Sequence, residues 1–420
     1  MGKLFAYADD EGRLVFPPEL AFRFGLKPGA KFYIDEKSNA LCLRQPVTHL
    51  AKVYIEPTNR CNLECRICMR NVWDEPLGEM SRATFARIIE ALRSFSPPPA
   101  VFFGGLGEPL AHPDIVEMVA QAKSLGSFVE LITNGTLLTK ERAHQLIEAG
   151  LDRLWVSLDG ATPESFADVR LGAALPEVLT NLANFRRARW PKYPPFLFFD
   201  YNMKPEIGIV FVAMKRNIAD LPSVLRLGYQ FGAMYFMVTN VLPYAREMCK
   251  EVIYSQVIWN ISHNSFGPHL ELPNIDVSEI TAKSLYHAMR SYYDVNIAGC
   301  RLSESSNRCP FIEKGATAIG WDGGLSPCLS LLHSHVSFLE ESERFLRRYI
   351  VGNVSEADLM ELWHQPEYAA FRERVQTFEF SPCTTCGGCD LVETNEKDCF
   401  GNTFPTCGGC LWAQGVIQCP

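Results

Sequence analysis

The sequence lacks long hydrophobic runs. No stretch approaches the roughly 18–20 uninterrupted apolar residues that a transmembrane helix requires. The first ten residues, MGKLFAYADD, contain no apolar run of about 7–15 residues of the kind found in export signals. Residue 6 is Ala rather than Ser or Thr, so the myristoylation pattern is not met. We therefore expect a cytoplasmic protein that does not associate with membranes.

Histidine and positive charge are also scarce. The 420 residues include only 9 His, and 40 Lys and Arg against 48 Asp and Glu give a net charge of −8. Such a charge does not favour binding to the phosphate backbone, so nucleic acid is not an expected partner. The hydrophobic content of 47% is ordinary for a folded chain. At about 100–200 residues per domain, the length predicts two to four domains.

Cysteine, in contrast, is abundant and unevenly distributed. The chain has 15 Cys, of which three lie within residues 61–68 and seven within residues 383–419. In a reducing compartment, clustered cysteines hold metal more often than they form disulfides. The clusters therefore predict metal sites, whereas Cys42 and Cys249 stand alone and are expected to be buried small hydrophobic residues.

Strand and helix patterns alternate from residue 52 to residue 239. This alternation predicts parallel strands joined by right-handed crossovers, which is an α/β fold. Six such units allow an open sheet or the partial (β/α)6 TIM-type barrel that we predict. The expected strands are Lys52–Glu56, Val101–Phe103, Phe128–Thr133, Arg153–Leu158, Ile207–Met214 and Met234–Thr239. The expected helices are Ser81–Arg93, Pro113–Leu125, Thr139–Ala149, Pro176–Ala188 and Leu221–Phe231.

Four domains are expected from these patterns. A small β domain covers residues 1–48, the partial barrel 49–250, a polar and mostly helical connector 251–299, and a Cys-rich unit 300–420. In the Cys-rich unit, Glu343–Val351 and Asp358–Val375 have helical patterns, and His333 and His335 are expected to be ordinary surface or core residues. The last 40 residues have too little apolar content for a core, so metal is expected to hold them together.

The first 48 residues resemble a known dimerisation module. A short strand, Leu14–Phe16, precedes a Pro17-Pro18 helix start, a turn at 25–29 and a hairpin formed by residues 31–35 and 40–44. This order resembles the AbrB-type swapped-hairpin domain, which implies dimerisation and, in many members, DNA binding. The alternative is an arbitrary β cap on the following domain.

Cys61, Cys65 and Cys68 follow the first strand of the predicted barrel with the spacing Cys-x3-Cys-x2-Cys. Three thiolates in one loop can ligate three irons of a cubane cluster and leave the fourth iron open to a cofactor or substrate. A zinc site completed by a distant ligand is the alternative. The loop resembles the signature of the radical S-adenosylmethionine (SAM) superfamily, which implies a [4Fe–4S] cluster that chelates SAM. Ile67 departs from the aromatic residue often found before the third cysteine.

Further motifs at strand ends resemble the SAM-binding elements of that superfamily. A Gly-rich loop supplies Gly104, Gly105, Gly107 and Glu108, and the resemblance implies that Glu108 accepts from the SAM ammonium group. Polar groups after the next two strands are expected to meet the SAM carboxylate or ribose, although turn formation is the alternative. These groups are Thr133, Asn134, Ser157 and Asp159, with Arg170 and Asn217 as weaker candidates.

The C-terminal cysteines resemble a second module. Cys309-x13-Gly323-x4-Cys328 is similar to the opening of the SPASM domain, which implies one or two auxiliary [4Fe–4S] clusters. Two four-thiolate clusters need eight ligands, and the chain offers ten candidates. A zinc ribbon built from Cys383/Cys386 and Cys407/Cys410 is the alternative for the tail. The ten candidates are Cys300, Cys309, Cys328, Cys383, Cys386, Cys389, Cys399, Cys407, Cys410 and Cys419.

Together these resemblances imply an enzyme that reductively cleaves SAM to methionine and a 5′-deoxyadenosyl radical, which abstracts a substrate hydrogen. No catalytic acid or base is expected beyond the cluster, because the cofactor supplies the reactive species. The N-terminus, the Gly-rich loop and the ending from Cys407 to Pro420 resemble maturases of tungsten-containing aldehyde oxidoreductases. This implies a peptide or protein substrate, or a step in installing a tungstopterin site.

Two further partners and one alternative function follow. The resemblance implies an electron donor such as ferredoxin or flavodoxin, and the N-terminal domain implies a homodimer. The alternative function is an iron–sulfur redox sensor or DNA-binding regulator that uses the AbrB-like domain.

Overall fold

The computed structural model describes most of the chain in eleven segments. These are residues 5–26, 32–37, 40–189, 203–254, 258–260, 269–271, 278–290, 294–297, 307–339, 342–384 and 389–420. The predicted metal ligands Cys300 and Cys386 lie outside the described residues.

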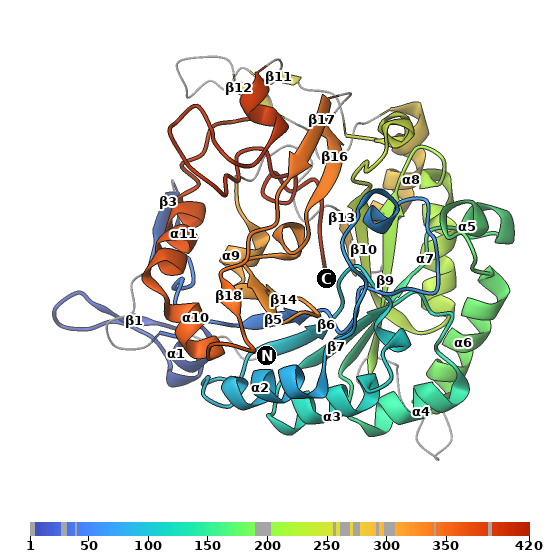
Figure 1. Ribbon diagram of the computed structural model, residues 1–420, viewed down its shortest axis with the longest axis horizontal. Coiled ribbons are helices and arrows are strands. Elements are labelled where there is room, and N and C mark those ends of the chain that lie inside the picture. Colours follow the sequence, from blue (N-terminus) through green and yellow to red (C-terminus); the bar gives the residue numbers. More distant parts are fainter. Residues whose placement is uncertain are drawn as a thin grey trace.

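A single mixed sheet organises the described residues (Figure 1), and its ten strands have the order β13-β10-β9-β8-β7-β6-β5-β14-β15-β18. Six consecutive parallel strands form its centre and confirm the six predicted strands, as well as the α/β class. They are β5 (Lys52–Ile55), β6 (Ala100–Phe103), β7 (Val129–Thr133), β8 (Arg153–Ser157), β9 (Glu206–Ala213) and β10 (Ala233–Asn240).

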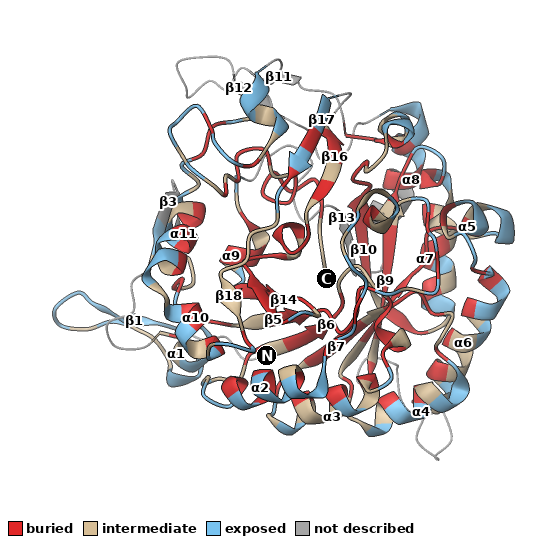
Figure 2. Ribbon diagram, viewed as in Figure 1, coloured by how far each residue is buried: buried red, intermediate tan, exposed pale blue. Residues whose placement is uncertain are grey.

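Helices cover the outer face of the six central strands (Figure 1). All five predicted helices are present, because their apolar residues recur at helical spacing and face the sheet (Figure 2). They are α2 (Arg82–Leu92), α3 (Ile115–Ser124), α4 (Lys140–Glu148), α6 (Leu175–Ala188) and α7 (Leu221–Gln230). The short helix α5 (Pro163–Val169) was not predicted, although Thr162 and Ser165 form a capping box at its start. None of the described helices is long and apolar enough to cross a membrane.

The sheet continues into the C-terminal part of the chain. Strand β14 (Ala316–Ile319) pairs in parallel with β5, and β15 (Gly324–Ser326) and β18 (Gly352–Asn353) follow in antiparallel pairing. At the other edge, β13 (Asp294–Ile297) pairs in parallel with β10. The barrel strands and the Cys-rich region therefore share one hydrogen-bonded sheet.

The predicted helix over Glu343–Val351 is wrong. Residues Ser342–Leu346 form strand β17, which pairs in antiparallel register with β16 (His335–Leu339). Arg344 and Leu346 are buried while Glu343 and Phe345 are exposed, so the burial has the two-residue period of a strand. The predicted Asp358–Val375 helix is two helices, α10 (Leu359–His364) and α11 (Pro366–Thr377), because Pro366 ends the first. Helix α9 (Pro310–Glu313) precedes β14.

The expected helical connector is only partly helical where it is described. Helix α8 (Glu279–Arg290) lies within it, but so do the hairpin of β11 (Ile258–Asn260) and β12 (His269–Glu271), and the sheet strand β13. The boundaries of the four domains remain predictions.

The N-terminal residues form two small antiparallel pairs and a short helix; the second pair and the helix were predicted, whereas the pairing of the first strand was not. Strand β1 (Tyr7–Ala8) pairs with β2 (Leu14–Val15), and β3 (Ile34–Lys37) pairs with β4 (Ala40–Leu43) after helix α1 (Pro18–Arg23). The resemblance to the AbrB-type domain stays a prediction. The segment that follows is anchored to the C-terminal helices, because Arg372 Nε donates to the Val47 carbonyl at 2.8 Å and Trp363 Nε1 to that of Thr48 at 2.9 Å.

The C-terminal tail lies against the interior of the open barrel, where Figure 1 marks the chain end. The Tyr54 hydroxyl on β5 donates to the Pro420 carbonyl at 2.6 Å. Across the sheet, the Gln418 N–H donates to Thr239 Oγ1 at 2.8 Å and Asn240 Nδ2 to the Val416 carbonyl at 2.8 Å. The tail thus bridges the first and last strands of the barrel and covers its interior.

Candidate functional site

The three cysteines after β5 line a cavity of about 220 Å³ at the carboxyl ends of β5 to β8, which we call the cluster-loop cavity. Cys65 is buried and Cys61 and Cys68 are half-buried. Parallel strands bring their carboxyl ends to one edge, so motifs far apart in the sequence meet here. The predicted cofactor residues among the lining are Gly105, Gly107, Glu108, Thr133, Asn134, Ser157 and Arg170.

Two glycines of the loop after β6 are required by close backbone approach. A Cβ atom at Gly107 would overlap the carbonyl oxygen of Thr58, and one at Gly105 would overlap the Glu56 side chain. The neighbouring Glu108 N–H donates to the Arg60 carbonyl at 2.8 Å. These contacts dock the Gly-rich loop directly on the segment that leads into Cys61. Gly104 faces Phe102 and Ile132 instead and is not part of the cavity wall.

Glu108 joins the ends of β6 and β7. Its Oε1 accepts from the Thr133 hydroxyl at 2.8 Å and from the Leu110 N–H at 3.0 Å, and its Oε2 accepts from the Asn134 N–H at 2.7 Å. Burial raises the pKa of this carboxyl, while the three donors act in the opposite direction. The carboxyl group is therefore rigidly placed at the cavity wall.

Arg170 lies over the cysteine loop and is held by Asp159. Its Nε donates to Asp159 Oδ2 at 2.6 Å, and its Nη1 is 3.8 Å from Cys65 Sγ. Burial lowers the pKa of Arg170, but the Asp159 carboxylate outweighs this effect and the pKa is raised. Asn134 Nδ2 approaches Cys61 Sγ at 3.8 Å in the same way. The sulfurs of Cys61 and Cys65, two of the predicted ligands, thus have N–H donors beside them.

Besides Gly104, two sequence candidates do not reach the cavity. Asp159 is fully buried and binds Arg170 and the Val212 N–H, so it positions Arg170 rather than lining the wall. Asn217 donates to the carbonyls of Asp159 and Val212, at 3.0 and 2.9 Å, and joins two loops.

Sequence reasoning missed Arg70, Met69 and Tyr244, which do line the cavity. Tyr244 could have been suspected from its place just after β10, the sixth barrel strand.

Four C-terminal cysteines surround a second, narrow cavity, which we call the four-cysteine cavity. Cys309, Cys328, Cys407 and Cys410 all line it, although they come from segments about 80 residues apart in sequence. Burial raises the pKa of Cys309 to about 12 and also raises the pKa values of the other three thiols. The zinc-ribbon alternative needs Cys407 and Cys410 to pair with Cys383, which does not line this cavity.

The donor set fits an iron–sulfur cluster better than a single ion. Four cysteine thiols are the usual ligand set of a [4Fe–4S] cluster, and binding converts them to thiolates. Here three of the four are buried and Cys410 is half-buried. In the described part of the chain, no three Cys, His, Asp or Glu side chains gather closely enough to hold one metal ion. A cubane is wider than an ion, so thiols spaced around a cavity wall match it.

The remaining cysteines are distributed as follows. Cys383 and Cys399 lie close enough to interact electrostatically, and Cys389 is exposed nearby in sequence. Cys419 accepts from Trp412 Nε1 at 3.4 Å. Cys42 and Cys249 are half-buried rather than buried, so that prediction is wrong for both.

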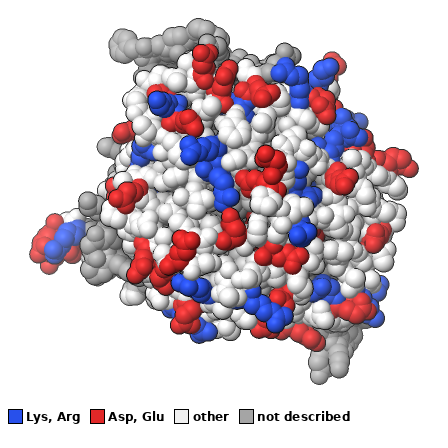
Figure 3. Space-filling view, viewed as in Figure 1, with Lys and Arg blue, Asp and Glu red and all other residues white. Residues whose placement is uncertain are grey.

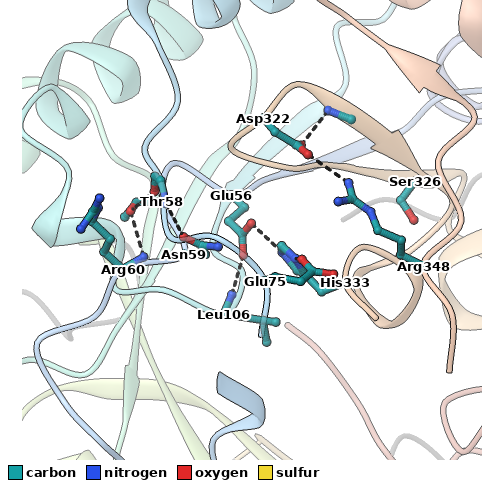
Figure 4. A network of polar contacts seen from close by, with 12 residues as sticks. Glu56, Thr58, Asn59, Arg60, Glu75, Leu106, Asp322, Ser326, His333 and Arg348 are labelled. Carbon is teal, nitrogen blue, oxygen red and sulfur yellow. Dashed lines mark hydrogen bonds and ion pairs between the residues drawn. The ribbon is translucent and has the colours of Figure 1, made fainter. Parts of the chain in front are cut away.

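A buried histidine connects the Gly-rich loop to the C-terminal region (Figure 4). His333 Nε2 donates to Glu56 Oε2 at 2.8 Å, and its Nδ1 bonds Glu75. Glu56 Oε1 in turn accepts from the Leu106 N–H at 2.9 Å. Burial lowers the pKa of His333, but the two carboxylates outweigh it and raise the pKa to about 9. We call this group the His333 clasp. Its role could not be seen in the sequence, because its three members are far apart.

Comparison with known proteins agrees with this geometry. The sequence profile of the radical SAM superfamily matches residues 55–207, and that of the SPASM iron–sulfur cluster-binding domain matches residues 309–390. A tungsten-containing aldehyde ferredoxin oxidoreductase cofactor-modifying protein of Pyrococcus furiosus is 30% identical over 88% of this chain and 96% of its own. The chain belongs to the radical SAM superfamily. It is a SAM-dependent enzyme with a SAM-binding [4Fe–4S] cluster and auxiliary clusters.

Other radical SAM proteins share parts of the sequence or the fold. A PqqA peptide cyclase of Streptomyces rochei is 34% identical over 33% of this chain and 36% of its own. The structure of Streptococcus suis SuiB bound to the precursor peptide SuiA superimposes with a TM-score of 0.53 at 15% identity. That alignment covers 84% of this chain and 72% of SuiB, and at this identity it shows a shared fold.

The His333 clasp predicts a pH-dependent stability. The folded-state pKa of about 9 lies above the ordinary 6.5, so the stabilisation is complete below about pH 6.5 and is lost as the pH rises through about 9. We expect His333→Gln to lower the free energy of unfolding by about 2–4 kcal/mol at pH 6, because it leaves the buried Glu56 carboxylate and the half-buried Glu75 carboxylate without this cation. The difference from the wild type should shrink by pH 10 in denaturant titrations.

The control is His364→Gln, which changes an exposed histidine on α10. This variant should stay within about 0.5 kcal/mol of the wild type at every pH. A His333→Gln effect that is the same at pH 6 and pH 10 would contradict the clasp.

Proposed function

We propose that this radical SAM enzyme is a maturase of a tungsten-containing aldehyde oxidoreductase system and that it acts on a peptide or protein substrate. The observation that carries this proposal is the relative from Pyrococcus furiosus, whose length the similarity covers almost completely. Peptide-modifying proteins among the relatives and fold neighbours support the substrate class. An electron donor such as ferredoxin or flavodoxin and a cytoplasmic location complete the proposal.

In this proposal Cys61, Cys65 and Cys68 ligate the cluster that binds SAM. When bound, this cluster would supply the electron that cleaves SAM, and SAM would supply the 5′-deoxyadenosyl group. Glu108 presents its carboxylate to the SAM ammonium group, and Thr133 and the Asn134 N–H fix its orientation. Arg170 and Asn134 donate to the ligand sulfurs of Cys65 and Cys61 and thereby favour the thiolate form. The surrounding walls exclude water from the reactive species.

For the auxiliary clusters we propose a specific division of the cysteines. Cys309, Cys328, Cys407 and Cys410 hold one cluster, which the four-cysteine cavity supports. Cys383 and Cys399 lie close enough to interact electrostatically, which supports a second set with Cys386 and Cys389. This division leaves Cys300 and Cys419 without a cluster.

The alternative of a DNA-binding regulator is not favoured, because charges of both signs are interspersed over the visible face (Figure 3).

Anaerobic reconstitution with iron and sulfide tests these assignments. We expect about twelve irons per chain and 5′-deoxyadenosine from SAM after reduction. Replacing Cys61, Cys65 and Cys68 by Ala should remove about four irons and all 5′-deoxyadenosine, because the SAM-binding cluster is lost. Replacing Cys309, Cys328, Cys407 and Cys410 by Ala should remove about four irons of a different cluster. Iron analysis and chromatography of the products provide the measurements.

Cys249→Ala is the control and should retain all of the iron. Intact clusters without 5′-deoxyadenosine would refute the SAM-cleaving assignment. Metal-free aldehyde oxidoreductase should accelerate 5′-deoxyadenosine release severalfold, and no acceleration would refute the maturase assignment.

We also propose that the N-terminal unit forms a homodimer. Large apolar side chains are exposed along its strands and helix, which is uncommon on a monomer surface. They are Phe5, Tyr7, Leu14, Phe22, Phe24, Tyr33, Ile34, Leu41 and Leu43. Deleting residues 1–46 should therefore convert a dimer to a monomer in light scattering coupled to gel filtration. If the ratio of particle mass to chain mass is the same before and after the deletion, this proposal is wrong.

A further inference from the structure

A third cavity of about 210 Å³ lies between the two cysteine sites, and we call it the central chamber. It shares Gly105, Leu106 and Tyr244 with the cluster-loop cavity, and Ser330 and Trp412 with the four-cysteine cavity. The C-terminal tail closes one side through Ile417, Gln418 and Cys419. A group bound in the chamber would therefore be next to both cysteine sites and shielded from solvent on the side that the tail covers.

The wall of the central chamber carries no charge. Among the described residues that line it there is no Asp, Glu, Lys or Arg, and most of the lining residues are apolar. A carboxylate, ammonium or phosphate group entering such a space would lose its hydration without gaining an ionic partner. The chamber therefore suits an uncharged group.

Three buried polar atoms of the wall lack a partner within the described part of the chain. They are His335 Nε2 and Ser330 Oγ, on side chains that are 2% and 4% exposed, and Gln418 Oε1. Buried polar atoms are rarely left without a hydrogen bond. These three atoms therefore indicate a ligand that completes their bonding.

The bonding of His335 specifies what that ligand must offer. Its Nδ1 donates to the His333 carbonyl at 3.0 Å, so Nε2 carries the lone pair and can only accept. Burial lowers the pKa of His335 to about 4, so the ring is neutral at neutral pH. The Tyr244 ring meets the imidazole edge to face, with ring centres 5.6 Å apart, and fixes its plane. Nε2 therefore needs an O–H or N–H donor.

We propose that the central chamber binds the reacting part of the substrate and that His335, assisted by Ser330, selects an uncharged group bearing an O–H or N–H donor. This assignment adds a substrate class to the proposed function. It rests on that function, because it takes the neighbouring cluster-loop cavity to be the SAM site. For a peptide substrate, the target is an uncharged residue with a hydroxyl or N–H, and acidic and basic residues are rejected. His335 is thus a specificity-determining residue of the reaction.

A matched series of small probes tests the proposal on the reconstituted full-length chain without turnover. Phenol offers the O–H donor, toluene has the same ring without it, and benzoate and benzylammonium add charge. Ligand-observed NMR at neutral pH should show phenol binding about threefold to tenfold more tightly than toluene, the effect of one hydrogen bond. Benzoate and benzylammonium should bind at least about tenfold more weakly than phenol.

Variants then test whether His335 causes the preference for phenol over toluene. His335→Leu should abolish the difference between phenol and toluene, while His335→Gln, which keeps an acceptor oxygen, should retain part of it. The matched control His364→Leu should retain all of it. Equal binding of phenol and toluene to the wild type, equal binding of benzoate and phenol, or a preference that survives His335→Leu would overturn the proposal. The wild-type series needs no variant, so it stays decisive even if His335→Leu fails to fold.

The two proposals fail separately. Absence of 5′-deoxyadenosine with the probe preference intact would refute the proposed SAM-cleaving function and leave the chamber's selectivity standing. Normal 5′-deoxyadenosine formation without any probe preference would refute the selectivity of His335 alone.

Discussion

The parallel pairing of β14 with β5 is the constraint on which the rest of the structure depends. It places Ala316–Ile319 in register with Lys52–Ile55, so the Cys-rich region and the barrel become parts of one sheet. Cys61 follows β5 and Cys309 precedes β14, and a hydrogen-bonded sheet is rigid. The distance between the two cysteine sites is therefore set by backbone pairing rather than by a flexible linker.

Two further contacts reinforce this arrangement from opposite sides. The His333 clasp ties the end of β5 and the Gly-rich loop to the segment before β16, because the His333 cation balances the buried Glu56 and the half-buried Glu75 carboxylates. The C-terminal tail crosses the barrel interior from Thr239 to Tyr54. Between these contacts lies the uncharged central chamber. A radical formed at one side would meet only what the chamber admits, which is the protection this chemistry requires.

The parts of this account that depend on local pattern could be predicted from the sequence. The six barrel strands follow from alternation of strand and helix, and the meeting of Cys61, Glu108 and Thr133 follows from their shared position at strand ends. The strand at Ser342–Leu346 differs from the predicted helix. A short charged segment with two buried positions is compatible with both the helical period of 3.6 residues and the strand period of two.

Other features depend on long-range packing, which spacing does not encode. Asp159 has the right place for a cofactor ligand, but it turns inward to hold Arg170. The grouping of Cys309 and Cys328 with Cys407 and Cys410 could not be read from intervals of about 80 residues. Likewise, His333 and His335 look alike in sequence. Two carboxylates raise the pKa of His333 and keep it charged, whereas burial lowers the pKa of His335 and keeps it neutral.

Anomalous X-ray diffraction from crystals of the reconstituted protein at the iron edge tests the central claim most directly. The account predicts one iron peak beside Cys61, Cys65 and Cys68 and another amid Cys309, Cys328, Cys407 and Cys410, with the central chamber between them. An iron peak at the first site with zinc or no metal at the second would contradict it.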